Sequence, residues 1–246
     1  MTVAVGDSLR GPYATLSAGS STTPSIGPAV RAAAADAKRQ IRDMAEQRYG
    51  ENADKHSLAE LLSVLGNAQI LGSGSRGPNP TGMTVLTFGV QVAEVAVDVE
   101  TGEVAVERIA AIHDVGRVVN PLGASSQVEG GIIQGVGHTL SEERLVDPET
   151  GTILTRTLDA YKMPTIADVP EIVTELVDVP DAHLTNLGSK GLGEPPIVPV
   201  AAAIANAIRD ATGAAVRSLP ITREEMLAAL REARQRAGSR GAPAAV

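Results

Sequence analysis

The pattern of apolar and polar positions predicts a chain that mixes helices and strands. Apolar residues recur at three- and four-residue spacing from about Pro28 to Tyr49, which predicts a helix with Pro28 in its first turn. A shorter helix is expected from Ser57, where Ser57 and Glu60 form a capping box and Gly66 ends the segment. Before Pro28 the chain is rich in Gly, Ser, Thr and Pro, which predicts a short strand at residues 3–5 followed by loops.

The pattern changes to period two after the second helix and predicts a β-hairpin. Residues 84–98 form one strand, with the alternation broken around Ala93–Glu94, and residues 104–112 form the other. Residues 98–102, Asp-Val-Glu-Thr-Gly, supply the turn between them. The similar sequence at residues 147–151 predicts a second turn of the same kind.

The segment from Ser125 to Leu140 combines an apolar stripe with a high glycine content and predicts a helix. Ser126 and Glu129 give it a capping-box pattern. Each glycine inside an exposed helix costs up to about 1 kcal/mol. We therefore expect a backbone or a bulky ligand to approach this helix closely at its four glycines, Gly130, Gly131, Gly135 and Gly137.

The C-terminal third predicts one strand, two helices and a disordered tail. Residues 172–179 read as a strand, and a helix carrying Ile197 to Ala211 follows, with Gly213 as its cap. A last helix opens with a capping box at Thr222, and the tail over residues 235–246 is expected to fray. Because strands and helices are mixed without regular βαβ alternation, the fold class is α+β, with mixed β-hairpins and helices.

Composition and charge exclude several classes of protein. The 246 residues carry 21 Lys and Arg against 29 Asp and Glu, and the net charge of −8 argues against nucleic acid as the main partner. The absence of cysteine excludes a disulfide scaffold, a Cys-ligated zinc site and an iron–sulfur cluster held by this chain. No apolar run approaches the roughly 18–20 residues of a membrane span, and no signal peptide is visible, so a cytoplasmic location is expected.

The loop from Gly188 to Pro196 is the first candidate site. Its glycines, the charge of Lys190 and the start of the following helix suit an anion. Glu194, held rigid by two prolines, could act as a general base. Alternatively, Glu194 is an N-terminal charge that interacts favourably with the helix dipole. The glycines do not follow the strand–G-x-G-x-x-G–helix order, so a Rossmann site is not favoured.

The second candidate is His113–Pro121, which connects a strand to the Gly-rich helix. Here Arg117 and Asn120 place donors around a helix N-terminus, together with Ser125, Ser126 and Gln127. This arrangement suits an anion or a polar cofactor, and the plain alternative is a polar connection. The four histidines lack metal-ligand spacing, and neither H-E-x-x-H nor G-x-S-x-G occurs.

These motifs resemble molybdenum hydroxylases of the xanthine dehydrogenase and aldehyde oxidase family. Gly188–Pro196, with the Ala-rich helix and the Leu-Pro-Ile-Thr of residues 219–222 behind it, is similar to the C-terminal end of their molybdopterin-binding large subunit. Asp114–Pro121, continued by Gln127–Gly137, looks like a second cofactor segment of the family, and residues 19–23 are similar to a third. The resemblance implies that residues 1–246 are a C-terminal portion of the molybdopterin-binding, catalytic domain.

The resemblance also implies a cofactor and a reaction. Such proteins hold molybdenum on a pterin dithiolene, in bacteria often as the cytosine dinucleotide. A glutamate base, here Glu194, deprotonates a molybdenum-bound hydroxyl that attacks an electron-poor carbon of an aldehyde or N-heterocycle. No protein side chain is expected to bind the metal. The resemblance implies that the cofactor is held by Ser20, Ser21, Thr22, Arg117, Val118, Val119, Asn120, Pro121, Leu122, Gly123, Gln127, Lys190, Gly191, Leu192 and Gly193.

Family members work with other polypeptides. The iron–sulfur clusters and FAD are expected on separate partner subunits. The large subunits of the family are much longer, so we expect this chain to be a C-terminal piece that lacks the N-terminal half of its subunit. Two other hypotheses stay open: a non-catalytic subunit that completes a cofactor cleft, and an unrelated phosphate- or nucleotide-binding domain. Replacing Glu194 by Gln would discriminate them, since a phosphate binder gains nothing from a carboxylate there.

Overall fold

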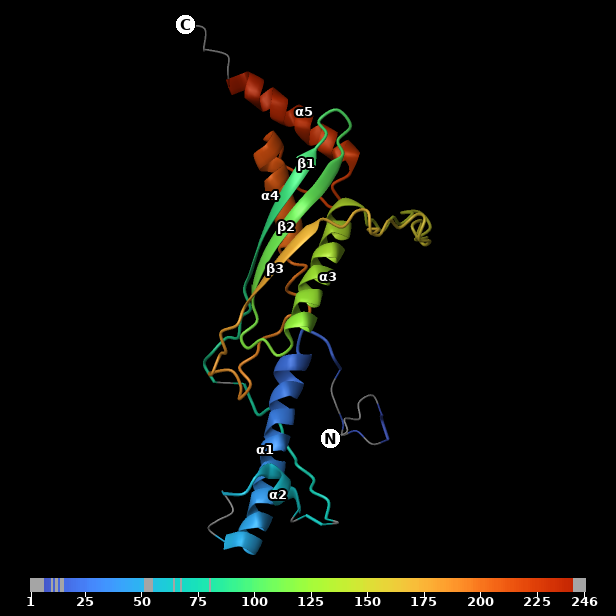
Figure 1. The fold of residues 1–246 in the computed structure, drawn as a ribbon. Helices are drawn as coiled ribbons and strands as arrows, with labels where there is room; N and C mark the ends of the chain where they lie inside the picture. Colours follow the sequence, from blue (N-terminus) through green and yellow to red (C-terminus); the bar gives the residue numbers. More distant parts are fainter. Residues whose placement is uncertain are drawn as a thin grey trace.

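The computed structural model describes residues 7–9, 11, 13, 16–50, 55–63, 65–66, 68–79 and 81–240. The elements, in chain order, are α1 (Thr22–Tyr49), α2 (Leu58–Ser63), β1 (Gly89–Val97), β2 (Val104–Asp114), α3 (Pro121–Leu140), β3 (Glu171–Val177), α4 (Val200–Thr212) and α5 (Arg223–Arg240). Figure 1 shows an elongated molecule with α1 and α2 at one end and the sheet with α3, α4 and α5 at the other. Among the described residues, no helix is long and apolar enough to cross a membrane.

A three-stranded sheet with the order β1-β2-β3 forms the centre of the larger end. The predicted hairpin is confirmed: β1 and β2 pair antiparallel, with a bulge between Glu94 and Val95 next to the predicted break in alternation. β1 begins at Gly89, later than the predicted residue 84. The Asp98 N–H donates to the carbonyl of Glu103 (2.9 Å), and the Gly102 N–H donates to Asp98 (2.8 Å), which closes the predicted turn.

The sequence pattern predicts β3 as a strand but not its pairing partner. β3 lies parallel to β2, with Arg108 opposite Glu171 and Asp114 opposite Val177. A parallel pair needs a long crossover, and α3 together with the segment after it supplies one. The sheet is therefore mixed and contains one βαβ unit that the absence of regular alternation did not reveal. The coarser class, helices with a small mixed sheet, agrees with α+β.

The predicted start of α1 was wrong by several residues. The helix begins at Thr22, so Pro28 lies buried inside it rather than in its first turn. A proline has no N–H, and the carbonyl four residues earlier loses its helical partner. That carbonyl belongs to Pro24 and instead accepts a hydrogen bond from Nε of Arg76 at 3.1 Å. A contact from a distant loop therefore replaces the missing helical bond.

The predicted cap of α3 was also wrong. The helix begins at Pro121, and its N-cap is Asn120, whose Oδ1 accepts a hydrogen bond from the N–H of Gly123 at 3.0 Å. Ser126 lies inside the helix instead of capping it. Pro121 at the first helical position has the fixed φ that a helix start favours. A stronger local signal therefore competes with the capping-box pattern of Ser126 and Glu129.

Two other capping boxes are confirmed. Glu60 accepts from the N–H of Ser57 at 2.7 Å at the start of α2, which ends at Ser63, before Gly66. At the start of α5 the N–H of Glu225 donates to Oγ1 of Thr222 at 3.2 Å, while the Thr222 N–H donates to Oε2 of Glu225 at 3.4 Å. Both pairs are local in sequence, which is why the sequence pattern is sufficient to find them.

The ends of the last elements are close to the predicted ones, except at the tail. The strand predicted at residues 172–179 is present as β3, and Gly213 caps α4 in a left-handed conformation (φ 72°). The predicted turn at residues 147–151 is present, since the Gly151 N–H donates to the Asp147 carbonyl at 2.8 Å. Residues 235–240, which the sequence analysis expected to fray, continue α5. Residues 241–246 and the strand predicted at residues 3–5 lie outside the described residues.

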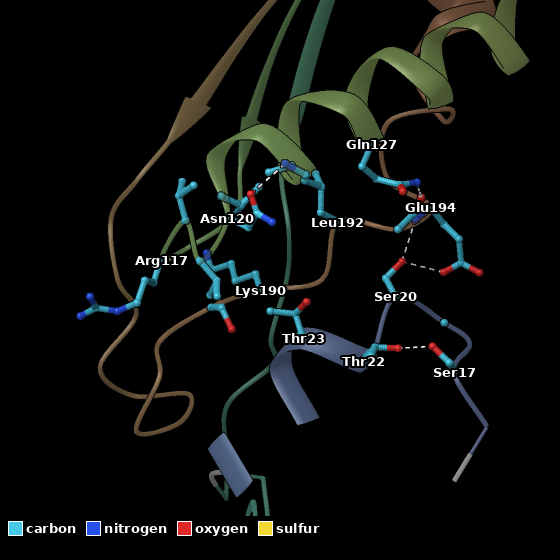
Figure 2. Close-up of a pocket in the computed structure, with 18 of the residues that line it drawn as sticks. Ser17, Ser20, Thr22, Thr23, Arg117, Asn120, Gln127, Lys190, Leu192 and Glu194 are labelled. Atoms are coloured by element: carbon cyan, nitrogen blue, oxygen red, sulfur yellow. Dashed lines mark hydrogen bonds between the residues drawn. The ribbon is translucent and has the colours of Figure 1, made fainter. Parts of the chain in front are cut away.

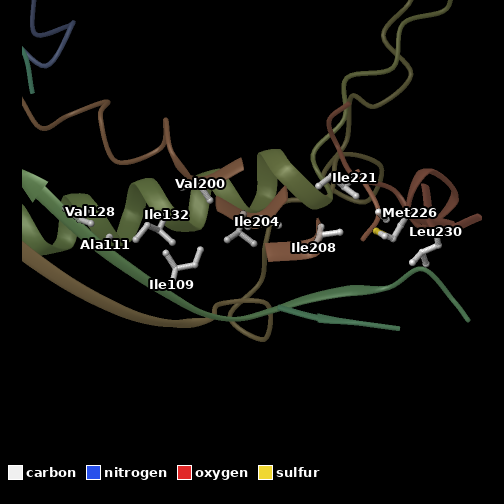
Figure 3. Packing of buried hydrophobic residues seen from close by; sticks show 12 residues of the cluster. Ile109, Ala111, Val128, Ile132, Val200, Ile204, Ile208, Ile221, Met226 and Leu230 are labelled. Atoms are coloured by element: carbon white, nitrogen blue, oxygen red, sulfur yellow. The ribbon is translucent and has the colours of Figure 1, made fainter. Parts of the chain in front are cut away.

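The core lies between one face of the sheet and helices α3, α4 and α5 (Figure 3). It is built from aliphatic side chains and one methionine: Ile109, Ala111, Val128, Ile132, Val136, Val200, Ile204, Ile208, Ala214, Ile221, Met226 and Leu230. Burial of these side chains is the main force that holds the layers together. Because α3 and α4 pack side by side, the start of α3 lies near the loop that precedes α4.

Close packing explains three of the four glycines of α3. A Cβ on Gly131 would lie 2.6 Å from Cβ of Pro196, and one on Gly135 would lie 2.5 Å from Cβ of Val200. A Cβ on Gly137 would meet Glu142 and Pro164, whereas one on Gly130 would find nothing within 4 Å. The predicted close approach is therefore confirmed at three positions, and the approaching groups belong to the protein rather than to a ligand.

We expect Gly135→Ala to destabilise the fold and Gly130→Ala to leave it intact or stabilise it. The first change forces a methyl group into Val200 and should cost about 1–3 kcal/mol. The second places the same methyl group in open space and improves helix propensity by up to about 1 kcal/mol. Urea unfolding of both variants measures the difference. Equal midpoints would show that α3 and α4 do not pack as described.

Candidate active site

A cavity of about 520 Å³ lies where the three predicted motifs meet (Figure 2). The loop before α1, the connection from β2 to α3 and the loop before α4 each supply part of its wall. Twelve predicted site residues line it: Ser20, Thr22, Arg117, Val118, Val119, Asn120, Gly123, Gln127, Lys190, Leu192, Gly193 and Glu194. Segments more than 170 positions apart in the sequence thus form one site, of the size expected for a small-molecule pocket.

The remaining predicted residues lie elsewhere. Ser21 and Gly191 line a neighbouring cavity of about 730 Å³, and Pro121 and Leu122 line neither cavity. Both cavities share a partition made of Gly19, Ser20, Ser189, Lys190 and Glu194. Contact of any of these residues with a cofactor stays a prediction.

The second cavity includes residues that sequence reasoning missed. Arg76, Asn79 and Phe88 line it, and none of them belongs to a predicted motif. The available signal was the Gly- and Pro-rich composition of residues 72–82, since such segments form loops, where binding residues concentrate. One donor of Arg76 is already used within the protein, because its Nε donates a hydrogen bond to the Pro24 carbonyl.

Glu194 is held by a reciprocal pair of hydrogen bonds with Ser20. The Ser20 hydroxyl donates to Oε2 of Glu194 (2.8 Å) and accepts from the backbone N–H of Glu194 (2.8 Å). Glu194 remains exposed and faces both cavities. Its position corrects one expectation: α4 begins only at Val200, and turns separate it from Glu194. The favourable interaction with a helix dipole is therefore weaker than a position at the helix start would give.

Lys190 lies in the wall of the cavity and forms an ion pair. Its Nζ donates to Oδ2 of Asp114 at 2.5 Å, and the Lys190 side chain is 13% exposed. Partial burial alone would raise the pKa of Asp114, but hydrogen bonds from Lys190 and from the N–H of Gly116, with the charge of Lys190, lower this pKa below its ordinary value. The cation is therefore largely balanced within the protein.

The two predicted motifs bind each other through their backbones. The Arg117 N–H donates to the Gly188 carbonyl at 2.8 Å, and the Lys190 N–H donates to Val115 at 2.8 Å. Gly116, opposite Ser189, has φ 61° and lies so close to Gly188 that a Cβ would be 2.3 Å from its carbonyl oxygen. The motif residues therefore shape the cavity wall as well as line it.

Polar side chains predicted to hold the cofactor make hydrogen bonds to the protein. Nε of Arg117 donates to the Leu187 carbonyl (2.9 Å), and Nε2 of Gln127 donates to the Gly193 carbonyl (2.7 Å). Asn120 caps α3 through Oδ1. Each side chain keeps further polar atoms, such as the two Nη atoms of Arg117. The helix N-terminus offers fewer free N–H groups than the sequence suggested, because one is capped and Pro121 has none.

A buried pair beneath the loop supports the residues that follow Glu194. Nε2 of Gln91 donates to the Pro196 carbonyl at 2.7 Å and lies 3.3 Å from Nε2 of His113. His113 is 1% exposed, and burial lowers its pKa below the ordinary 6.5. A hydrogen bond donated by Gln91 to Nε2 fits the neutral form of His113 with its proton on Nδ1. Sequence reasoning did not find this pair.

These features define a domain in which a Gly-rich loop, a helix start and a carboxylate surround a polar cavity. Comparisons with known proteins identify it. Residues 1–170 match the family model of the molybdopterin cofactor-binding domain. The chain therefore belongs to this family, as the resemblance of its motifs predicted.

Relatives within the family are molybdenum enzymes. The chain is 42% identical over 135 residues to the putative xanthine dehydrogenase molybdenum-binding subunit of Escherichia coli K12, which covers 55% of this chain and 18% of that subunit. It is 33% identical over 237 residues to the probable hypoxanthine oxidase of the same strain, covering 90% of this chain and 24% of that protein. The structure also matches the aldehyde oxidoreductase of Desulfovibrio desulfuricans, with a TM-score of 0.67 and 28% identity. The match covers 86% of this chain and 23% of that protein. The chain thus spans about a fifth to a quarter of these relatives.

The donors of the cavity fit a molybdenum–pterin cofactor. Hydroxyls of Ser17 and Thr23, amides of Asn120 and Gln127, and the cation of Lys190 suit a polar group that carries phosphate. Within the part of the chain that the structure describes, no cluster of three or more His, Cys, Asp or Glu could hold a metal ion.

We expect the buried His113 to make stability depend on pH. Because its pKa is lowered in the folded state, the unfolded chain binds the proton more readily, so stability is full above about pH 6.5 and falls as the pH drops below it. The free energy of unfolding should decrease less between about pH 7.5 and 5.5 in His113→Phe than in the wild type. The other histidines are present in both proteins, so their contributions to the pH dependence cancel in the comparison. An equal decrease in both would exclude this role of His113.

Proposed function

We propose that this chain is the C-terminal catalytic portion of a molybdenum-cofactor-dependent hydroxylase that oxidises an aldehyde or an N-heterocycle, with Glu194 as general base. The observation that carries the proposal is the position of Glu194: it is fixed by Ser20, exposed, and shared by two cavities. A base must reach both the cofactor and the substrate, and a carboxylate in a partition between two cavities can do so. The names of the relatives, xanthine dehydrogenase, hypoxanthine oxidase and aldehyde oxidoreductase, support these two substrate classes.

The residues around the 520 Å³ cavity would hold the cofactor, which we propose is the cytosine dinucleotide form. When bound, this group supplies two-electron redox chemistry at its metal. Lys190 and the hydroxyl groups would bind its polar parts, and Gln127 keeps the loop next to Glu194 in place through Gly193. Glu194 accepts a proton at its carboxylate when the substrate is attacked.

One observation counts against a simple phosphate-binding domain. The start of α3 is capped by Asn120 and begins with a proline. A phosphate site at this helix would need free N–H groups. The non-catalytic hypothesis, in which the chain only completes a cofactor cleft, remains as an outcome of the experiments below.

We further propose that the chain works with an iron–sulfur subunit, an FAD subunit and the remaining part of a molybdenum-binding subunit. The support is that several relatives are named as subunits and that the chain spans only 18% of one of them. The cytoplasmic location stays a prediction of the sequence.

We expect Glu194→Gln to lower turnover strongly without loss of cofactor. The amide has the shape of the carboxylate and can accept the Ser20 hydrogen bond, but it cannot take up a proton. Turnover of the assembled enzyme should fall by about 10²–10⁴-fold, the usual contribution of a general base, while molybdenum content stays constant. Steady-state kinetics with an aldehyde and a purine, together with metal analysis, measure both.

Glu224→Gln is the matched control for this experiment. Glu224 is an exposed glutamate in the first turn of α5, away from both cavities, and its change should leave turnover as in the wild type. Full turnover in Glu194→Gln would refute the role of Glu194 as base. Unchanged or tighter phosphate binding with no molybdenum in either protein would favour the phosphate-binding domain.

We expect molybdenum and pterin nucleotide to co-purify with the complex rather than with the chain alone. The chain contributes one part of the cofactor site, since it spans a fifth to a quarter of its relatives. Metal analysis after expression alone and with its genomic neighbours tests this expectation. Near-stoichiometric molybdenum in the lone chain would show that the cavity is complete without other polypeptides. Molybdenum in neither preparation would favour a chain without redox chemistry.

A further inference from the structure

We propose that Ser20 is a positioning residue that fixes the carboxylate of Glu194, rather than a ligand of the cofactor. The catalytic meaning of this inference rests on the proposed function, but the contact itself is independent of it. Ser20 lies in the loop before α1 and Glu194 in the loop before α4, at a sequence separation of 174 residues. Figure 2 shows the two side chains facing each other, with both hydrogen bonds drawn.

The hydroxyl of Ser20 already has its donor and one acceptor site in use. It has a single O–H, which it donates to Oε2 of Glu194, and one of its lone pairs accepts the backbone N–H of Glu194. A cofactor phosphate would need a donor, and the Ser20 hydroxyl has none left. The reciprocal pair holds both the backbone and the carboxylate of Glu194, which a single hydrogen bond would not do.

The backbone of Ser20 is in an unfavourable conformation. Its φ of 57° is left-handed, and among the described residues it is the one non-glycine with positive φ. A side chain with a Cβ adopts this conformation at an energetic cost, and such outliers persist where the surrounding structure requires them. Glycine would adopt it freely. The presence of serine there indicates that the hydroxyl has a function that offsets the strain.

The loop before α4 is shaped to receive Ser20. A Cβ on Gly191 would lie 2.6 Å from the carbonyl oxygen of Ser20, and one on Gly193 would lie 3.2 Å from its Oγ. From the other side, Gln127 holds the Gly193 carbonyl at 2.7 Å. The segment before Glu194 is therefore fixed between α3 and Ser20, and Ser20 supplies the hydrogen bond to the carboxylate.

This arrangement distinguishes the two carboxylate oxygens of Glu194. Oε2 accepts the hydrogen bond from Ser20, so Oε1 is the oxygen that would take up the proton in the proposed reaction. An exposed glutamate otherwise samples several rotamers, and a general base must hold its geometry to be effective. Ser20 would thus raise the fraction of molecules in which Glu194 is correctly oriented.

The test uses Ser20→Gly and Ser20→Ala in the full chain and in the assembled enzyme. Ser20→Gly removes the hydroxyl and also the backbone strain, so a loss of function cannot be attributed to poorer folding. The matched control is Ser218→Ala, which removes a similar hydrogen bond from a serine to Glu225 Oε1 (2.5 Å), far from both cavities.

The first measurement is hydrogen exchange of the Glu194 amide, which needs no cofactor. Removal of its acceptor should speed exchange about five-fold in both Ser20 variants and not in Ser218→Ala. The second is kinetics: kcat should fall about 10–100-fold, as expected for a misoriented catalytic group, with KM and molybdenum content unchanged.

Each alternative outcome overturns the proposal in a recognisable way. Unchanged amide exchange in Ser20→Gly would show that the contact does not restrain Glu194. Faster exchange with full kcat would show that the contact has no catalytic consequence. Loss of molybdenum together with activity would make Ser20 a cofactor ligand, as the resemblance implied. Failure of the proposed function is separate, since it would appear as full turnover in Glu194→Gln whatever the exchange rates are.

Discussion

Gly131 and Gly135 let α3 lie against Pro196 and Val200 at a distance that no larger residue would permit, and this contact places the candidate site. It brings the chain that enters α4 along α3, so that the Gly-rich loop reaches the start of that helix. The same packing buries the aliphatic core between the helices and the sheet. A methyl group added at Gly135 would therefore loosen the core and also move the loop before α4 away from the start of α3.

Many polar side chains around the cavity form hydrogen bonds or ion pairs with other parts of the protein. Lys190 balances Asp114, Asn120 caps α3, and Gln127 holds the Gly193 carbonyl. Polar groups that leave water must be paired, so a cavity wall built from loops needs these bonds before it can bind anything. The motif residues thus determine the shape of the pocket. The polar atoms that these hydrogen bonds leave unpaired are the ones available to a ligand.

Glu194 combines two properties that rarely occur together in an exposed side chain. It is accessible from two cavities, yet Ser20 restrains both its backbone and its carboxylate. Buried support from Gln91 and His113 fixes the next residues through the Pro196 carbonyl. A fixed carboxylate beside a polar cavity is what proton transfer to a protein base requires, which is why the proposed function centres on this residue.

The sequence alone determined the family, the β1–β2 hairpin and the capping boxes at Ser57 and Thr222, because these signals lie within a few neighbouring residues. It also identified the three motifs that line the cavity. Only the tertiary structure decided the parallel pairing of β3, the replacement of the Pro24 bond by Arg76, and the contact between Ser20 and Glu194. Each of these contacts joins segments that lie far apart in the sequence. A hydrogen bond across 174 residues has no local pattern, since the fold between its partners sets the distance.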